Sequence, residues 1–114
     1  MHRLLVAVAC ALLCALVAAS IAQARMKRPP HYSAWLCIHR FEGSWTDSGA
    51  PYWGGLQMDM SFMRAYGAGL LARKGTADHW TPLEQMWVAE TAAFGWGKRG
   101  FYPWPTTARM CGLL

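Results

Sequence analysis

Glu42 has the clearest chemical potential in this sequence, because it stands where an apolar helix is expected to end and an aromatic-rich loop to begin. The segment around it, residues 35–57, is WLCIHRFEGSWTDSGAPYWGGLQ. A carboxylic acid held against aromatic surface keeps its proton more readily, since burial disfavours the charged form. The same aromatic surface can stack against sugar rings. The pattern therefore indicates a general acid beside a carbohydrate-binding groove.

The first 24 residues are typical of an export signal. A short basic start is followed by an uncharged apolar run, residues 4–19, and by the small-x-small triplet Ala22-Gln23-Ala24. We expect a signal peptide over residues 1–24, removed before Arg25, and a secreted, cell-wall-associated product. The alternative is a retained anchor, because residues 4–22 are nearly long enough to span a bilayer. Membrane contact is expected only in that case.

The 90 residues after the leader are enough for one small domain, with a basic, flexible lead-in over 25–32 and the domain over 33–114. Ten basic and six acidic residues give this part a net charge of +4. A basic exported protein is attracted to anionic surfaces such as bacterial walls. Nucleic acid is not an expected partner, because the basic residues are scattered and the chain is exported.

The helical pattern predicts a mainly α fold with about three helices. The first is expected to begin with Ser33 as its N-cap and to end at Gly43, which places Glu42 in the last turn. The second covers residues 60–66, with Asp59 as its N-cap. Between them, residues 44–53 are rich in Gly, Pro and Ser and predict a loop or a short irregular hairpin.

The third helix has the clearest start, because Thr81-Pro82-Leu83-Glu84 combines an N-cap, a Pro at N1 and a Glu at N3. It is expected to run to about Phe94. Capping accounts for Glu84, and Glu90 is expected on a solvated face. Residues 68–79 predict a loop with at most one short helical turn, and the tail after Phe94 is interrupted by Gly and Pro.

Two cysteines, Cys37 and Cys111, remain after the leader, and export permits a disulfide between them. The bond would close most of the mature chain and stabilise it by roughly 4 kcal/mol, an upper figure from the chain-entropy estimate. No metal or cofactor is expected. The three histidines of the mature part lack the spacing of metal ligands: His31, His39 and His79.

The chain resembles the resuscitation-promoting-factor type of transglycosylase-like domain, a group of small secreted actinobacterial relatives of lysozymes and lytic transglycosylases. The resemblance covers nearly the whole mature chain and is most specific from Glu-Gly-Ser-Trp to Gly-Gly-Leu-Gln within residues 42–57. It implies an α+β lysozyme-like fold around a substrate cleft. The other matching positions are Tyr66-Gly67, Gln85, Trp96-Gly97, Trp104-Pro105 and Cys111-Gly112.

The resemblance assigns the catalytic role to Glu42, and Cys37 and Cys111 look like the family's disulfide. Many members carry a cysteine directly before the glutamate, whereas here that position is Phe41. Gln57 matches a residue that contacts sugar, and Tyr52 or Trp53 stands at a paired-aromatic position. The expected substrate-binding residues are Trp45, Tyr52, Trp53, Gln57 and Trp96.

The implied activity is cleavage of the β-1,4 bond between N-acetylmuramic acid and N-acetylglucosamine in peptidoglycan. The reaction needs a proton for the leaving oxygen, and Glu42 is the expected donor. A hydrolase needs a second carboxylate, for which Asp47 and Asp59 are candidates, although a loop turn and an N-cap explain them more simply. A lytic transglycosylase needs Glu42 alone, as acid and then base.

Two further hypotheses remain open at this point. A non-catalytic cell-wall glycan-binding module would use the same aromatic groove without needing Glu42. A small disulfide-bonded secreted protein acting on a partner protein would need neither. For the enzyme, the expected partners are peptidoglycan strands and other wall hydrolases, and the expected state is a monomer.

Overall fold

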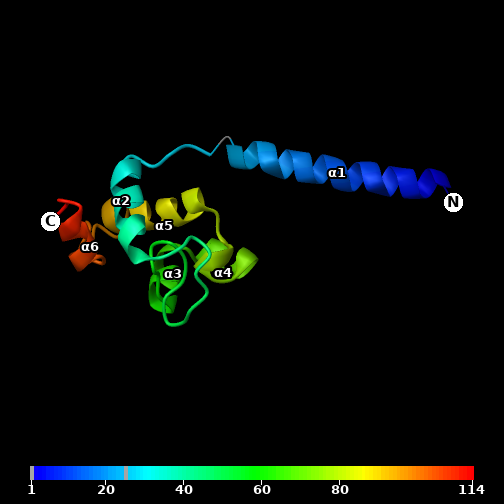
Figure 1. Cartoon of the computed structure of the whole chain (residues 1–114). Helices are drawn as coiled ribbons and strands as arrows, with labels where there is room; N and C mark the ends of the chain where they lie inside the picture. Colours follow the sequence, from blue (N-terminus) through cyan, green and yellow to red (C-terminus); the bar gives the residue numbers. More distant parts are fainter. Residues whose placement is uncertain (1, 25) are drawn as a thin grey trace.

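The computed structural model describes residues 2–24 and 26–114, with side chains for 2–18 and 26–114. The chain is mainly helical, as predicted, and its described part contains no strand apart from an isolated antiparallel bridge between Trp53 and Met58. Figure 1 shows how the helices are arranged in space. The elements are α1 (His2–Ala24), α2 (Tyr32–Glu42), α3 (Met60–Tyr66), α4 (Ala68–Lys74), the 3-10 helix η1 (Ala77–His79), α5 (Pro82–Phe94) and α6 (Pro105–Met110).

The expectation of about three helices was too low. The three predicted helices correspond to α2, α3 and α5, and the leader adds α1. The short helices α4 and α6 lie in segments predicted as loop and irregular tail. Both segments are rich in Gly or Pro. Gly67 is the N-cap of α4, and Pro105 is the first residue of α6, a position at which Pro is compatible with a helix.

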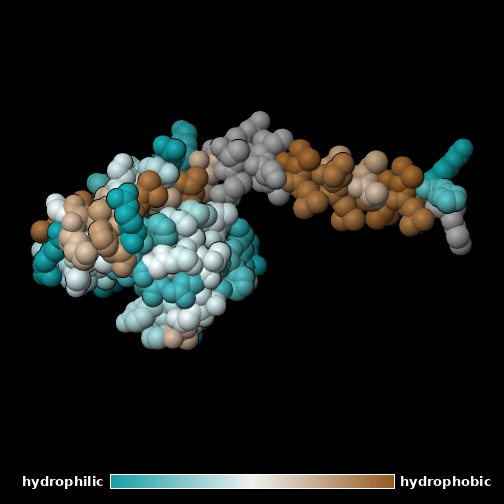
Figure 2. Space-filling view, viewed as in Figure 1, coloured by the Kyte–Doolittle hydropathy of each residue, from teal (hydrophilic) through white to brown (hydrophobic). Residues whose placement is uncertain are grey.

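The leader helix α1 extends away from the other helices (Figure 1) and is apolar along most of its length (Figure 2). Within the described residues, no helix meets the combined length and hydropathy needed to cross a membrane. Arg25, the expected first residue of the mature chain, lies outside the described residues.

The segment between α1 and α2, predicted as a flexible lead-in, contacts α5. Pro29 is buried, and the Trp87 indole N–H donates a hydrogen bond of 2.6 Å to the Lys27 carbonyl. Helix α2 follows this segment and begins at Tyr32. Its N-cap is His31 and not the predicted Ser33. Ser33 is instead exposed in the first turn.

Helix α5 is the centre of the fold, because it contacts both α2 and α3 (Figure 1). Its predicted capping box is present: the Thr81 hydroxyl accepts from the Glu84 backbone N–H, and Glu84 accepts from the Thr81 N–H. Most of the helix is buried, so its apolar residues do not form a single stripe. The core around it includes Trp35, Ile38, Leu56, Met63, Trp80 and Met86.

Glu90 is buried, which contradicts its expected place on a solvated face. The residue is 5% exposed on α5. Its Oε2 accepts a 2.6 Å hydrogen bond from the Trp35 indole N–H, and its Oε1 lies 2.7 Å from His31 Nδ1. The His31 ring also stacks on Phe94 at 4.0 Å between centroids. Glu90 therefore fastens the start of α2 to α5.

Removing the Glu90 carboxyl group is expected to destabilise the fold. In Glu90→Ala the buried Trp35 N–H loses its acceptor, and we expect a loss of about 3 kcal/mol in the free energy of unfolding. This loss in the free energy of unfolding is measured by urea unfolding, with tryptophan fluorescence as the signal. The same substitution in a Trp35→Phe background should cost less, since the donor is already gone. Equal costs in both backgrounds would show that this hydrogen bond is not the cause.

Glu84 gives a pH-dependent contribution to stability. Partial burial alone would raise the pKa of Glu84, but hydrogen bonds from Lys74 and the Thr81 backbone outweigh it, so the pKa lies below the usual 4.5. The folded state therefore favours the ionised form. Its contribution is present above the unfolded pKa and is lost as pH falls through the folded pKa.

Glu84→Gln keeps a capping side chain and removes the charge. We expect it to cost about 0.5–1 kcal/mol at neutral pH, the usual size of a helix N-terminal charge with a partly exposed ion pair. Urea unfolding at several pH values should show the gap in unfolding free energy between wild type and variant closing as the pH falls below the ordinary glutamate pKa of 4.5. A gap that is constant with pH would contradict an electrostatic origin.

Candidate active site

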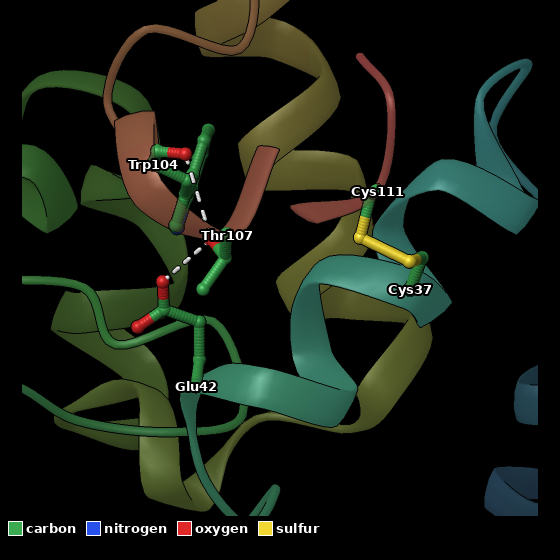
Figure 3. Close-up of a disulfide and its surroundings, with 5 residues drawn as sticks. All are labelled: Cys37, Glu42, Trp104, Thr107 and Cys111. Carbon is green, nitrogen blue, oxygen red and sulfur yellow. Dashed lines mark hydrogen bonds between the residues drawn. A yellow bond between two sulfur atoms is a disulfide. The ribbon is translucent and has the colours of Figure 1, made fainter. Parts of the chain in front are cut away.

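Glu42 is the last residue of α2 and is partly exposed. Its Oε1 accepts a hydrogen bond of 2.8 Å from the Thr107 hydroxyl on α6, as Figure 3 shows. The predicted disulfide is present and joins the same two helices, with 6.0 Å between the Cα atoms of Cys37 and Cys111. The bond thus holds the acid against its hydroxyl partner. Nothing in the sequence around Thr107 indicated this role.

The loop after α2 brings Asp47 and Gln57 next to Gly43, the residue that follows Glu42. The Gln57 side-chain amide donates to Asp47 Oδ2 at 2.8 Å and to the Gly54 carbonyl at 2.9 Å. A Cβ placed on Gly43 would lie 3.0 Å from Gln57 Nε2, so the amide packs directly against the residue after Glu42. The structure therefore places the Asp47–Gln57 pair beside the backbone that follows Glu42.

Both carboxylate oxygens of Asp47 accept hydrogen bonds within the loop that follows α2. Its Oδ1 accepts from the Gly49 backbone N–H at 3.0 Å, and its Oδ2 accepts from Gln57. Asp59 is likewise engaged, because its Oδ1 accepts from the Phe62 N–H as the predicted N-cap of α3. Both candidates for a second carboxylate thus have the local structural roles that their sequence context suggested.

The Gly-Gly pair is anchored by Gln85, a fully buried residue of α5. Its Oε1 accepts from the Gly55 N–H at 2.8 Å, and its amide nitrogen donates to the carbonyls of Trp45 and Trp80. Gly54 has a φ of 76°, and a Cβ there would lie 2.4 Å from Gln85 Oε1. Only glycine suits this position, which explains the first glycine of the motif.

Trp45 and Trp53 both contact other residues of the fold. The Trp45 ring stacks on His39 at 3.8 Å between centroids and lies against Gly55. Trp53 is half-buried against the core and pairs with Met58. Neither residue lines the groove described next, and their contact with sugar stays a prediction.

A groove of about 450 Å³ lies beside this cluster. Two predicted residues, Tyr52 and Gln57, line it, together with the unpredicted Trp104 and Arg99. Glu42 itself is not part of the lining. Two of its neighbours lie beside lining residues: Gly43, the next residue, lies beside Gln57, and Thr107, its hydrogen-bond partner, lies 3.5 Å from the Trp104 carbonyl. The remaining lining residues are Met58, Asp59, Ser61, Phe62, Ala65, Tyr66 and Pro103.

Trp96 lies on a second, adjoining hollow of about 320 Å³. The side chain is 71% exposed, and its ring centroid lies 6.4 Å from that of Tyr66. Ala65 and Tyr66 line both hollows. The hollow that Trp96 lines therefore borders the groove that Tyr52 and Gln57 line.

No group of three or more His, Cys, Asp or Glu side chains within the described ranges is arranged to hold a metal ion. No known protein family matches the sequence, and no curated protein is significantly similar to it. The family resemblance drawn from the motifs therefore stays a prediction.

Proposed function

We propose that this chain is a secreted peptidoglycan-cleaving enzyme in which Glu42 is the general acid and base. The observation that carries the proposal is the position of Glu42, which is held by the Thr107 hydroxyl at 2.8 Å and adjoins a groove lined by aromatic and amide side chains. Flat aromatic rings with a few polar groups are suited to binding sugars, and a single positioned carboxyl group is suited to proton transfer.

The proposed fold is a lysozyme-like arrangement in which the loop over residues 43–58 takes the place of the small β part. The antiparallel bridge between Trp53 and Met58 and the Gln85 anchor make this loop an ordered wall. In this arrangement α5 is the central helix, and the acid stands at the end of the helix that precedes the loop.

The proposed reaction is lytic transglycosylation, because Asp47 is engaged in loop hydrogen bonds. Glu42 gives its proton to the glycosidic oxygen as the C1–O bond breaks, which leaves positive charge on the sugar ring. The Glu42 carboxylate then takes the proton of the same sugar's 6-hydroxyl as that oxygen bonds to C1. The products are a 1,6-anhydro end and a chain with a free 4-hydroxyl.

A digest of purified peptidoglycan tests the proposal. The expected mature chain, residues 25–114, and the full chain are each incubated with peptidoglycan, and the soluble products are identified by mass spectrometry. Anhydro-ended fragments support the proposed reaction. Reducing ends mean hydrolysis, with Asp47 the first residue to examine as the water-activating base. No soluble product from either chain contradicts an enzymatic function.

A glycan-binding module without catalysis is the second candidate, because Glu42 lines neither hollow, whereas the exposed Tyr52 lines the groove and the exposed Trp96 lines the adjoining hollow. Tyr52 and Trp96 are 48% and 71% exposed and present flat rings to solvent. Pull-down with insoluble peptidoglycan distinguishes the candidates. Binding that survives Glu42→Ala, together with an absence of product at any protein concentration, would favour the module. Failure of the chain to bind peptidoglycan would favour the third hypothesis, a secreted protein that acts on a partner protein.

A further inference from the structure

Arg99 is a cationic residue of the groove that the proposed reaction does not use. It follows α5 in the loop of residues 95–100, and its side chain lines the groove together with Tyr66 and Trp104. The guanidinium makes no hydrogen bond or ion pair with any described part of the chain. An unpaired arginine in a concave, partly aromatic site is available to an anionic ligand.

Backbone hydrogen bonds to the end of α5 fix the position of the Arg99 backbone, and therefore the point from which its side chain extends. The Arg99 N–H donates to the Ala92 carbonyl at 3.0 Å, and the Gly100 N–H donates to the Ala93 carbonyl at 2.9 Å. Gly97 packs so tightly that an added Cβ would lie 2.4 Å from the Ala92 oxygen and 2.7 Å from the Tyr66 ring. The loop therefore folds back onto the end of α5 and against one wall of the groove.

The charge distribution in the groove favours a carboxylate near Arg99. Asp59 is the acidic residue of the lining, and its Oδ1 is engaged with the Phe62 N–H. Asp59 forms no ion pair with Arg99, so the two charges stand more than 4.0 Å apart. A carboxylate ligand is repelled from the Asp59 side and attracted to the Arg99 side, which gives it one preferred orientation.

We propose that Arg99 makes this groove selective for glycans that carry a carboxylate over neutral glycans. The inference rests on the proposed function, since it assumes that the groove binds glycan. Two sources supply such a carboxylate in peptidoglycan: the lactyl group of a muramic acid without its peptide, and the stem peptide. Arg99 is a specificity-determining residue here and takes no part in proton transfer.

The test measures binding, not cleavage, with the full chain in isothermal titration calorimetry. Three ligands of equal length are compared: a neutral tetramer of N-acetylglucosamine, a tetrasaccharide of alternating N-acetylglucosamine and peptide-free N-acetylmuramic acid, and the same tetrasaccharide with stem peptides. The variants are Arg99→Gln, Arg99→Lys and, as the matched control, Lys98→Gln. Lys98 is the exposed neighbour on the same loop and does not line the groove.

Wild type is expected to bind one of the acidic ligands about fivefold more tightly than the neutral one, the size typical of a solvent-accessible charge pair. Arg99→Gln should remove this preference while leaving affinity for the neutral tetramer within about twofold. Arg99→Lys should keep part of it, because the charge stays and the paired N–H donors are lost. The acidic ligand that shows the preference identifies the source of the carboxylate.

Three outcomes would overturn the inference. Equal affinity of wild type for neutral and acidic glycans would reject Arg99 selectivity while leaving glycan binding in place. An equal loss in Lys98→Gln would show a general effect of net charge instead of a site in the groove. Failure of wild type to bind any of the three ligands would reject this inference and the proposed function together.

Discussion

Changing Glu42 to Gln is expected to lower the rate of glycan cleavage by about 100-fold or more, because an amide has no proton of suitable acidity to give to the leaving oxygen. General acid–base groups typically contribute about 10²–10⁴-fold to a rate. The amide oxygen of the variant still accepts the hydrogen bond that Thr107 donates to Glu42 Oε1 at 2.8 Å. We therefore expect the fold and glycan binding to be unchanged.

The measurement is the initial rate of release of soluble fragments from peptidoglycan, quantified by mass spectrometry. Glu84→Gln is the matched control, because it is the same chemical change on a partly exposed glutamate at the start of α5, away from the groove lining. Its rate should equal that of wild type at neutral pH. Circular dichroism and pull-down with insoluble peptidoglycan check that Glu42→Gln is folded and still binds.

A Glu42→Gln variant that keeps more than about a tenth of the wild-type rate would exclude Glu42 as the proton donor, since this loss is far below the range expected of a general acid. Asp47, which lies beside Gly43, would then be the next carboxylate to test. Because Asp47 holds Gln57 and the Gly49 backbone, its replacement is also expected to disturb the loop. An Asp47→Asn variant keeps the size of the side chain and limits that disturbance.

The parts of the fold that sequence predicted well are those set by local chemistry. The capping box at Thr81 and the N-cap at Asp59 each involve residues three positions apart, so their hydrogen bonds are specified within one short segment. Helix α3 was predicted with its observed bounds for the same reason. The Cys37–Cys111 bond was predictable because only two cysteines follow the leader.

The parts that sequence missed depend on contacts between distant segments. Glu90 has the same local surroundings as a surface glutamate, and its burial is set by Trp35, 55 positions away. Thr107 reaches Glu42 across 65 positions, and no local pattern distinguishes it from Thr106. Helix α4 was missed because Gly69 inside it and the glycines at its two ends weaken the local preference for helix, whereas contacts with α3 support it.

The candidate site was predicted only in part, because some of its residues belong to a local motif and others reach it through contacts between distant segments. Tyr52 and Gln57 were expected at the groove and line it, because they flank a Gly-Gly pair whose backbone conformation is specific. Trp45 and Trp53 stand in the same motif, but Trp45 stacks on His39 and Trp53 forms a backbone bridge with Met58, which no spacing in the sequence indicated. Arg99 enters the groove only because the loop after α5 folds back on Ala92.

Removing the disulfide is expected to cause the largest loss of stability. Cys37 and Cys111 are 74 positions apart, and the chain-entropy estimate for a loop of that length is about 4 kcal/mol at 25 °C. That is a large share of the stability of a domain of this size. In Cys37→Ser/Cys111→Ser we expect the midpoint of thermal unfolding to fall by about 20 °C.

The same change is expected to lower activity below the temperature of unfolding. The bond ties α2 to α6, which carry Glu42 and Thr107, so its loss lets the acid and its hydroxyl partner separate (Figure 3). Calorimetry and cleavage rates are compared for the double variant, for wild type after reduction, and for Cys10→Ser/Cys14→Ser. Cys10 and Cys14 are free and exposed on α1, so this control should match wild type.

Reduction of wild type and the double Cys→Ser change should give the same shift in the midpoint, because both remove the same crosslink. A double variant that unfolds within about 5 °C of wild type, a difference of about 1 kcal/mol, would show that packing of α6 against α2 is sufficient without the bond. In that case the position of Glu42 would depend on the Thr107 hydrogen bond and on the Trp104 core contacts. The reduced protein would then keep its cleavage rate.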